Sequence, residues 1–151
     1  AKLNNAKVKK EAAKKEYIKV SEALKVRLAS KGSWIQSSGR WWYRHNNGSY
    51  TSNGWELING KWYHFDRSGW MQTGWVQSGS SWYYLSGSGD MQTGWVKSSG
   101  SWYYLNSSGS MQTGWFNVSG KWYYAYSSGA LAVNTTTPDG YHVNYNGEWI
   151  K

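Results

Sequence analysis

A repeat of about 20 residues fills most of this 151-residue chain and constrains its fold more than any other feature. In one unit a Gly-Trp pair is followed by Trp-Tyr-Tyr, then by Gly-x-Met-Gln-Thr, and then by the next Gly-Trp. A period this short, kept in spacing as well as in composition, is typical of arrays in which each unit packs on its neighbours. The leading tryptophans of the five copies are Trp34, Trp55, Trp75, Trp95 and Trp115.

A second tryptophan and a thioether recur at the same step. The second tryptophans, each followed by a tyrosine, are Trp42, Trp62, Trp82, Trp102 and Trp122. With this alignment the first copy has one extra residue between its two tryptophans. The methionines that keep the step are Met71, Met91 and Met111, and Leu131 continues it.

Each unit predicts two short strands around a Gly-, Ser- or Asn-containing turn, such as Asn59-Gly60 or Ser99-Gly100. A lone hairpin is marginally stable in water, so each one must bury aromatic surface against the next. We therefore predict a mainly β fold, a solenoid of stacked hairpins over residues 33–151 that ends in a cap-like segment from residue 133.

The basic charge belongs mainly to a different segment. The formal net charge is +9, of which residues 1–31 contribute +7 and residues 32–151 contribute +2. Apart from Tyr17, every aromatic residue lies between Trp34 and Trp149. Proteins that bind single-stranded nucleic acid interleave basic and aromatic side chains, so this separation argues against a nucleic-acid partner. Residues 1–32 are rich in helix formers and predict a solvated helix or the end of a longer coiled coil.

The composition excludes other classes of protein. The chain has no cysteine, which rules out disulfides and thiolate metal sites. It has no apolar run of the roughly 20 residues that span a bilayer. It begins at Ala1 without the apolar core of a signal peptide, so we expect that any export signal has been removed or is not part of this sequence. It carries no recognisable catalytic motif, and His64 with Asp66 is interpreted as an ordinary surface pair. We expect neither catalysis nor a metal or other cofactor.

Strand alternation predicts which aromatic side chains meet. With a turn near Gly79-Ser80, Trp75 and Trp82 share one face of a hairpin, while Val76 and Tyr83 occupy the other. Stacking then brings Trp75 and Trp82 against Tyr103 of the next hairpin, closed by Met91 or Met111. The equivalent predicted seams are Trp34, Trp42 and Tyr63; Trp55, Trp62 and Tyr83; Trp95, Trp102 and Tyr123; and Trp115 and Trp122 with Tyr141.

Two interpretations of these aromatics remain open. They could simply be the core of a solenoid that is poor in Leu and Ile. Alternatively, a seam of π-faces and a thioether, with few hydrogen-bond donors, suits a quaternary ammonium ion, which has no N–H groups. Such a cation is attracted to aromatic faces by about 2 kcal/mol or more when desolvated.

The pattern resembles the choline-binding repeats of streptococcal surface proteins. The resemblance covers residues 34–151 and rests on Gly-Trp, Trp-Tyr-Tyr and Gly-x-Met, together with an ending that includes Gly140-Tyr141 and Trp149. It implies a left-handed superhelix of hairpins that holds choline in Trp/Trp/Tyr cages between consecutive repeats. It also implies a secreted protein of the cell surface, held non-covalently on phosphocholine of cell-wall teichoic or lipoteichoic acids.

The first two copies depart from the pattern. The third position of the Trp-Tyr-Tyr triplet is Arg44 in the first copy and His64 in the second, which predicts weaker early cages if that position is a wall. Trp41, beside Trp42, is an alternative wall. Tyr50 and Trp70 either enlarge a seam or pack locally.

The sequence is also compatible with two functions other than choline binding. Glucan-binding repeats have a similar rhythm of aromatic residues and glycine, and tryptophan also stacks on sugar rings. In a host-interaction protein, the helix would make the contacts and the repeats would only anchor it. A homodimer formed through the chain ends is also compatible with the sequence.

Overall fold

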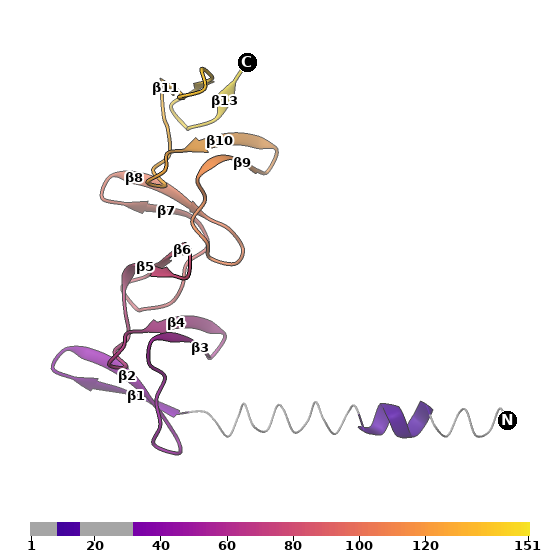
Figure 1. Ribbon diagram of the computed structural model, residues 1–151, viewed down its shortest axis with the longest axis vertical. Helices are drawn as coiled ribbons and strands as arrows, with labels where there is room; N and C mark the ends of the chain where they lie inside the picture. Colours follow the sequence, from indigo (N-terminus) through magenta and orange to yellow (C-terminus); the bar gives the residue numbers. More distant parts are fainter. Residues whose placement is uncertain (1–8, 16–31) are drawn as a thin grey trace.

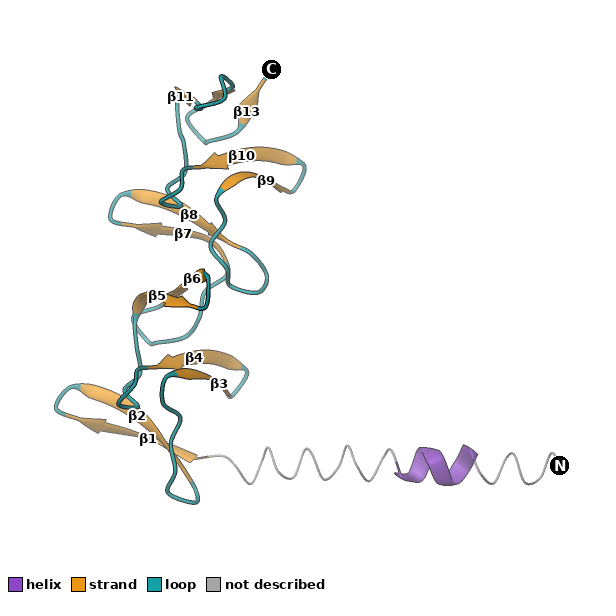
Figure 2. Cartoon of the chain, in the orientation of Figure 1, coloured by secondary structure: helices purple, strands orange, loops and turns teal. Residues whose placement is uncertain are grey.

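The computed structural model describes residues 9–15 and 32–151. Residues 9–15 form a helix with exposed side chains, within the segment of residues 1–32 that is predicted to be helical. Residues 1–8 and 16–31 of that segment lie outside the described residues, and its last residue, Gly32, begins a strand and not a helix. From residue 32 onward the chain forms strands and turns that stack along one long axis (Figures 1 and 2). The predicted solenoid of stacked hairpins is confirmed.

Five antiparallel hairpins and a small terminal sheet make up the column. Each hairpin is a separate two-stranded sheet, and β11, β12 and β13 form a three-stranded sheet at the C-terminal end. Successive hairpins project in different directions around the axis (Figure 1). The strands are β1 (Gly32–Ser37), β2 (Arg40–His45), β3 (Gly54–Ile58), β4 (Lys61–Phe65), β5 (Gly74–Ser78), β6 (Ser81–Leu85), β7 (Gly94–Ser98), β8 (Ser101–Leu105), β9 (Gly114–Val118), β10 (Lys121–Ala125), β11 (Thr135–Thr136), β12 (His142–Val143) and β13 (Trp149–Ile150).

Two-residue turns close the hairpins. In Asn59-Gly60 both residues have positive φ, 50° and 80°, as a type I′ turn requires. This geometry matches the twist of the strands and favours Asn-Gly and similar pairs. The turn at Gly79-Ser80 has positive φ at the glycine only, 62°. The turns therefore lie where the sequence predicts them, and they determine the strand register.

The register places the aromatic residues as alternation predicts. In the third hairpin Trp75 pairs with Tyr84 and Gln77 pairs with Trp82. Because side chains alternate between the faces of a strand, Trp75 and Trp82 share one face. The same pairing recurs in the second, fourth and fifth hairpins.

The connectors link each hairpin to the preceding one. The Met71 N–H donates to the Trp41 carbonyl oxygen at 2.7 Å, and the Met91 N–H donates to that of Trp62 at 2.8 Å. Met111 and Leu131 repeat this hydrogen bond with the carbonyl oxygens of Trp82 and Trp102. The glycine of the following connector lies against each methionine, so that a Cβ on Gly89 would come within 2.3 Å of the Met71 sulfur.

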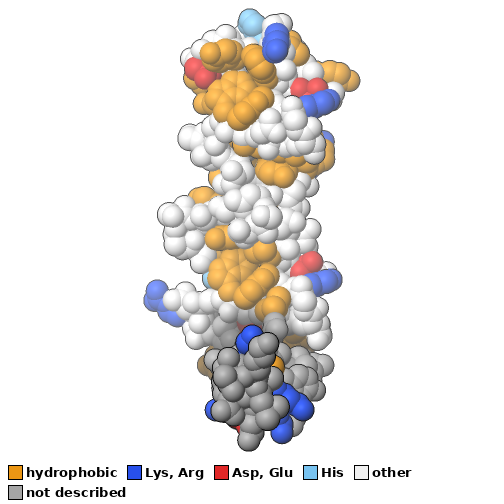
Figure 3. Space-filling view, turned by 90° about the vertical axis from the view of Figure 1, so that its right-hand side faces the viewer, with side chains coloured by type: hydrophobic (Ala, Val, Ile, Leu, Met, Phe, Trp, Pro, Cys, Tyr) orange, Lys and Arg blue, Asp and Glu red, His pale blue; other side chains and the backbone are white. Residues whose placement is uncertain are grey.

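The buried core is a narrow column of mostly aliphatic residues. The largest fully buried side chains are Phe65, Leu85 and Leu105, each one residue beyond the repeated aromatic triplet. The repeated tryptophans are only partly buried or exposed. Figure 3 shows hydrophobic surface in separate patches along the column. In the described part of the chain, no helix is long and apolar enough to cross a membrane.

Candidate functional site

A cavity walled by aromatic rings lies between consecutive hairpins. The cavity of the third hairpin has a volume of about 400 Å³ and draws on three successive repeats. Trp75 and Trp82 come from one face of that hairpin, Tyr103 comes from the next hairpin, and Met111 comes from the connector that follows it. The other lining residues, Ser127 and Ser128, belong to the following connector.

We call these side-chain groups cages and number them along the chain. The cavities of cages 1, 4 and 5 have volumes of about 420, 360 and 330 Å³. Cage 1 comprises Trp34, Trp41, Tyr63 and Met71; cage 3 comprises Trp75, Trp82, Tyr103 and Met111; cage 4 comprises Trp95, Trp102, Tyr123 and Leu131; and cage 5 comprises Trp115, Trp122, Tyr141 and Trp149. Cage 2 is assigned by the repeat spacing, the ring contact of Trp55 with Tyr83 and the backbone hydrogen bond from Met91 to Trp62, and comprises Trp55, Trp62, Tyr83 and Met91.

The two tryptophans of a cage have different environments. The leading one packs edge-on against the tyrosine of the next hairpin; the ring centroids of Trp75 and Tyr103 are 4.8 Å apart, and those of Trp55 and Tyr83 are 4.9 Å apart. The second one stands at the open side. Its exposed fraction is 38% for Trp41 and 45% for Trp122, at the two ends of the array. One wall is thus held by packing and the other presents its ring to solvent.

The first tyrosine of each triplet is the one that lines a cavity. Tyr63, Tyr103 and Tyr123 line cages 1, 3 and 4. The residue after it packs on the leading tryptophan of its own hairpin: Tyr84 lies 5.0 Å from Trp75, and His64 lies 4.7 Å from Trp55. His64 is buried and its Nδ1 is hydrogen-bonded to Gln72, not to Asp66. This position therefore does not wall a cage, and the condition on which weaker early cages were expected is not met.

The predicted seam of Trp34, Trp42 and Tyr63 is wrong in its second member. In the first hairpin Trp34 pairs with Tyr43 and Gln36 pairs with Trp41, so Trp41 occupies the place that Trp82 has in the third hairpin. The triplet of the first copy is Trp41-Trp42-Tyr43, and Arg44 lies outside it. Because neighbouring residues of a strand point to opposite faces, Trp42 lies on the other face.

Trp42 lines a smaller cavity at the N-terminal end of the array. This cavity has a volume of about 170 Å³, and Tyr50 and Trp70 also line it. The Arg40 guanidinium lies 4.1 Å from the centroid of the Trp70 ring. Trp42 therefore contributes to a local aromatic cluster outside cages 1 to 5.

Hydrogen bonds hold the leading tryptophans. The indole N–H of Trp55 donates to the Ser78 hydroxyl oxygen at 3.2 Å, and that of Trp75 donates to the Ser98 hydroxyl oxygen at 3.3 Å. The π-faces are left free by these bonds, since the donors lie in the ring plane. In cage 1, burial and the nearby charge of Asp90 raise the pKa of the Tyr63 phenol, which keeps this wall neutral.

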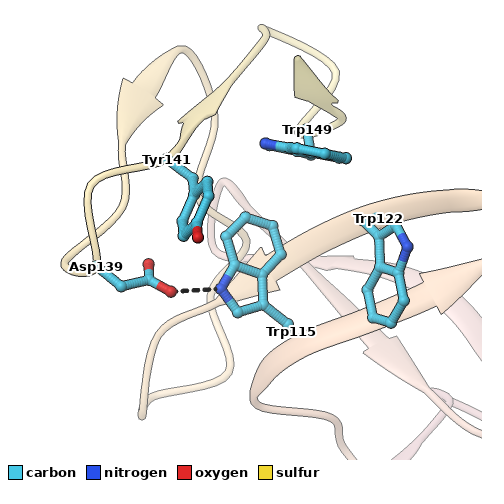
Figure 4. Close-up of a pocket in the computed structure, with 5 residues that line it drawn as sticks. All are labelled: Trp115, Trp122, Asp139, Tyr141 and Trp149. Atoms are coloured by element: carbon cyan, nitrogen blue, oxygen red, sulfur yellow. Dashed lines mark hydrogen bonds between the residues drawn. The ribbon is translucent and has the colours of Figure 1, made fainter. Parts of the chain in front are cut away.

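Cage 5 is built against the terminal sheet (Figure 4). Tyr141 lies edge-on to Trp115, with ring centroids 5.8 Å apart, and Trp149 adds a fourth aromatic wall. The Trp115 N–H donates to the Asp139 carboxylate at 2.8 Å. The predicted seam of Trp115, Trp122 and Tyr141 is therefore assembled, with two further residues at its edge.

Residues 52–93 and 92–135 match the profile of the choline-binding repeat. These matches cover more than half of the chain. The chain belongs to the choline-binding repeat family. It is a choline-binding module with clusters of aromatic residues.

Solved structures of other choline-binding proteins agree with this. Choline binding protein F from Streptococcus pneumoniae, solved with a peptidoglycan analogue, is 56% identical over 80% of this chain and 40% of its own, with a TM-score of 0.75. The multimodular pneumococcal cell wall endolysin from phage Cp-1, complexed with choline, is 42% identical over 80% of this chain and 37% of its own, with a TM-score of 0.59.

The curated relatives are much longer than the matched part. The lysozyme of Streptococcus phage Cp-1 is 55% identical over 29 residues, which are 19% of this chain and 9% of the lysozyme. The matched part is therefore less than a tenth of the length of the curated relatives.

Sequence reasoning missed some of the residues that line the choline-binding repeats. Trp41 was predicted only as an alternative to Trp42, although the step from Trp34 to Trp41 equals the step from Trp75 to Trp82 and this spacing favours Trp41. The serines and glycines of the next connector gave no such signal, because their place depends on how the repeats rotate about the axis. The residues missed are Gly87, Ser88, Ser127, Ser128, Val133, Asp139, Tyr145, Asn146, Glu148 and Trp149.

Proposed function

We propose that cages 1 to 5 bind choline groups and thereby anchor the protein non-covalently to phosphocholine on cell-wall teichoic acids. The observation that carries this proposal is the exposure of the second tryptophan in each hairpin, such as 41% for Trp82. A side chain that served only as core would be buried, since exposing an indole forfeits its hydrophobic stabilisation. Here the ring faces a cavity whose other walls are also aromatic.

The lining chemistry favours a quaternary ammonium ion. Cage 3 is lined by three aromatic rings, a thioether and two serines, and no carboxylate lines it. Attraction of a cation to aromatic faces needs no hydrogen bonds from the ligand. A trimethylammonium group presents three methyl groups to such rings and has no N–H to satisfy, so leaving water costs it less than it costs an ammonium ion that carries N–H groups.

The repetition of the cages suits a polymer that carries many choline groups. Each individual cage need bind only weakly, because joint occupancy along one chain multiplies retention. This supports attachment to a decorated wall polymer at the cell surface. The chain itself is proposed to bind and not to catalyse, because the part of the lysozyme relatives that it matches lies in the repeats.

Calorimetric titration of the chain with free choline tests the proposal. We expect saturable binding to several sites, and elution by choline from a quaternary amine resin. The absence of both heat and thermal stabilisation at millimolar choline would overturn the proposal. Elution by a soluble glucan instead of choline would indicate a carbohydrate-binding module.

A variant pair locates the sites. Trp82→Ala removes the exposed wall of cage 3 and is expected to lower the choline stoichiometry by about one. Trp82→Phe keeps a smaller π-face and is expected to retain the site with weaker affinity. An unchanged stoichiometry in Trp82→Ala, with lower thermal stability, would instead assign Trp82 a packing role.

A further inference from the structure

Cage 5 differs from the other cages in the charge of its lining. The Asp139 carboxylate lines this cavity together with four aromatic side chains (Figure 4). The linings of cages 1 and 3 contain no charged residue. Glu148 lines cage 4, but its Oε1 lies 3.1 Å from the Lys121 ammonium, so its charge is compensated.

The position of Asp139 is set by two hydrogen bonds. The Trp115 N–H donates to Oδ2 at 2.8 Å, and the Thr137 hydroxyl donates to Oδ1 at 2.6 Å. These donors, Thr137 first and Trp115 second, hold the pKa of Asp139 below its ordinary value, so the carboxylate is charged at neutral pH. Among residues 9–15 and 32–151, no Lys, Arg or His nitrogen lies within 4.0 Å of it.

Cages 2 and 3 differ from cage 5 in the acceptor of the leading tryptophan's indole N–H. There the same indole N–H donates to a neutral hydroxyl, from Ser78 or Ser98. Cage 5 keeps this hydrogen-bonding arrangement but has a negative charge at the acceptor position. A hydrogen bond to an ionised acceptor is roughly twice as strong as one between neutral groups.

This difference changes which cations the cage favours. An ammonium ion with an N–H loses a hydrogen bond to water when it enters an aromatic cavity, and that loss counts against binding unless an acceptor replaces it. The rim of cage 3 offers only hydroxyl and backbone acceptors, from Ser127 and Ser128. In cage 5 a charged carboxylate oxygen is available.

We propose that cage 5 accepts protonated amines bearing an N–H group, with Asp139 as the acceptor, in addition to quaternary ammonium ions. Cage 3, which no carboxylate lines, discriminates against such amines. The inference rests on the proposed function, because it takes cage 5 to be a cation site. The ligand class is small alkylammonium ions, and the specificity-determining residue is Asp139.

The test uses the indole N–H signals of the ¹⁵N-labelled chain as separate reporters of two cages. Trp115 reports on cage 5 and Trp75 on cage 3. The probes are choline and N,N-dimethylethanolamine, which is choline with one methyl group replaced by hydrogen and is protonated at neutral pH. At Trp75 we expect the dimethyl compound to bind about tenfold more weakly than choline, and at Trp115 within about threefold of choline.

Asp139→Asn provides the second arm. The amide oxygen keeps an acceptor for the Trp115 N–H, while the negative charge is lost. We expect affinity for the dimethyl compound at Trp115 to fall about tenfold and affinity for choline about threefold or less. Asp90→Asn is the matched control, because Asp90 does not line cage 5, and it should leave both affinities at Trp115 unchanged.

The outcomes separate this inference from the proposed function. The role of Asp139 would be overturned if the ratio of the affinities for choline and the dimethyl compound were the same at Trp115 and Trp75. It would also be overturned if Asp139→Asn lowered both affinities at Trp115 by the same factor. Either result would leave choline binding intact. Choline shifts at Trp75 without any at Trp115 would show that cage 5 is not a cation site. If choline shifts none of the indole signals, the proposed function itself fails.

Discussion

At the scale of single residues, the adjacent tryptophans of β2 show how strand alternation assigns function. Trp41 lines cage 1, whereas Trp42 packs with Tyr50 at the end of the array, with ring centroids 5.7 Å apart. The two residues have the same side chain and differ only in the face on which they lie. A slip of one residue in register would exchange their roles.

We predict that Trp41→Ala lowers choline stoichiometry by about one, because it removes the exposed wall of cage 1. Trp42→Ala should leave the stoichiometry unchanged, although it removes an aromatic contact and lowers stability. Isothermal titration of both variants, with thermal unfolding in parallel, measures the two effects. Loss of a site in Trp42→Ala but not in Trp41→Ala would contradict the observed pairing of β1 with β2.

The glycine that lies against each methionine side chain is a second position at which a single residue determines stability. Gly109 has a φ of 85°, and a Cβ on it would lie 2.5 Å from the Met91 sulfur. We predict that Gly109→Ala destabilises the fold by about 1–2 kcal/mol, the usual cost of a left-handed alanine, and displaces Met91 from cage 2.

Gly87→Ala is the matched control for this prediction. Gly87 lies in a connector, has no positive φ, and would place its Cβ in open space. Its free energy of unfolding in urea should therefore change by less than about 0.5 kcal/mol, as for most surface substitutions. Equal destabilisation by the two variants would argue against a close approach of Met91 as the cause.

At the scale of elements, the connectors are organised by polar side chains that accept backbone hydrogen bonds. Asp66 accepts from the N–H groups of Ser68 and Trp70, and Asn106 accepts in the same way from Ser108 and Ser110. In the third connector Asp90 is hydrogen-bonded to Ser86 and Gln92 instead. Different residues therefore build the same turn, which explains why this part of the repeat varies in sequence.

Asp90 makes its connector sensitive to acid. The hydrogen bond from Ser86, chiefly, holds the pKa of Asp90 below its ordinary value of 3.8. A depressed folded-state pKa stabilises the fold above the unfolded-state pKa, and this contribution is lost as the pH falls through the folded-state value. We predict that Asp90→Ser, which introduces the residue found at Ser110, destabilises the chain at neutral pH and that the difference narrows on acidification.

Urea unfolding of both proteins at a series of pH values, from roughly 6 down to roughly 3, measures this narrowing. Asp139 also has a lowered pKa, but it is present in both proteins and its effect cancels in the difference. A difference in unfolding free energy that stays constant over this range would show that the ionised Asp90 carboxylate contributes nothing to stability.

At the scale of the whole molecule, each cage joins neighbouring repeats, and a bound ligand therefore bridges them. Among the described residues, contacts between hairpins are few compared with those within a hairpin, and the fully buried core is narrow. A ligand that binds only the folded array stabilises it by an amount that grows with ligand concentration. The stability of the folded array therefore rises with the number of cages that hold a ligand.

We predict that choline raises the thermal unfolding midpoint and that the rise continues well above half-saturation. Each occupied cage contributes about 2.7 kcal/mol at a choline concentration one hundred times its Kd. Circular dichroism against choline concentration measures the shift, and Trp82→Ala should remove the contribution of one cage. The uncharged isostere 3,3-dimethyl-1-butanol is the control; an equal shift with it would assign the effect to apolar burial instead of cation binding.

Most of the fold could be predicted from the residues because its rules are local. The 20-residue period, the Asn-Gly and Ser-Gly turns and the alternation along each strand act within one hairpin. They correctly placed Trp75 and Trp82 on one face and brought Tyr103 against Trp75. The same rules failed at Trp42, where two adjacent tryptophans satisfied the motif and the pairing of β1 with β2 decided between them.

What the sequence alone determined is therefore the repeating unit: its hairpin, its turns and the aromatic face it presents. Only the tertiary structure decided which repeats share a cage, that Met111 and not Met91 closes cage 3, and that Asp139 borders cage 5. The reason is physical. A period of two residues along a strand is a local property of the backbone, whereas the rotation from one hairpin to the next arises from contacts between residues far apart in the chain.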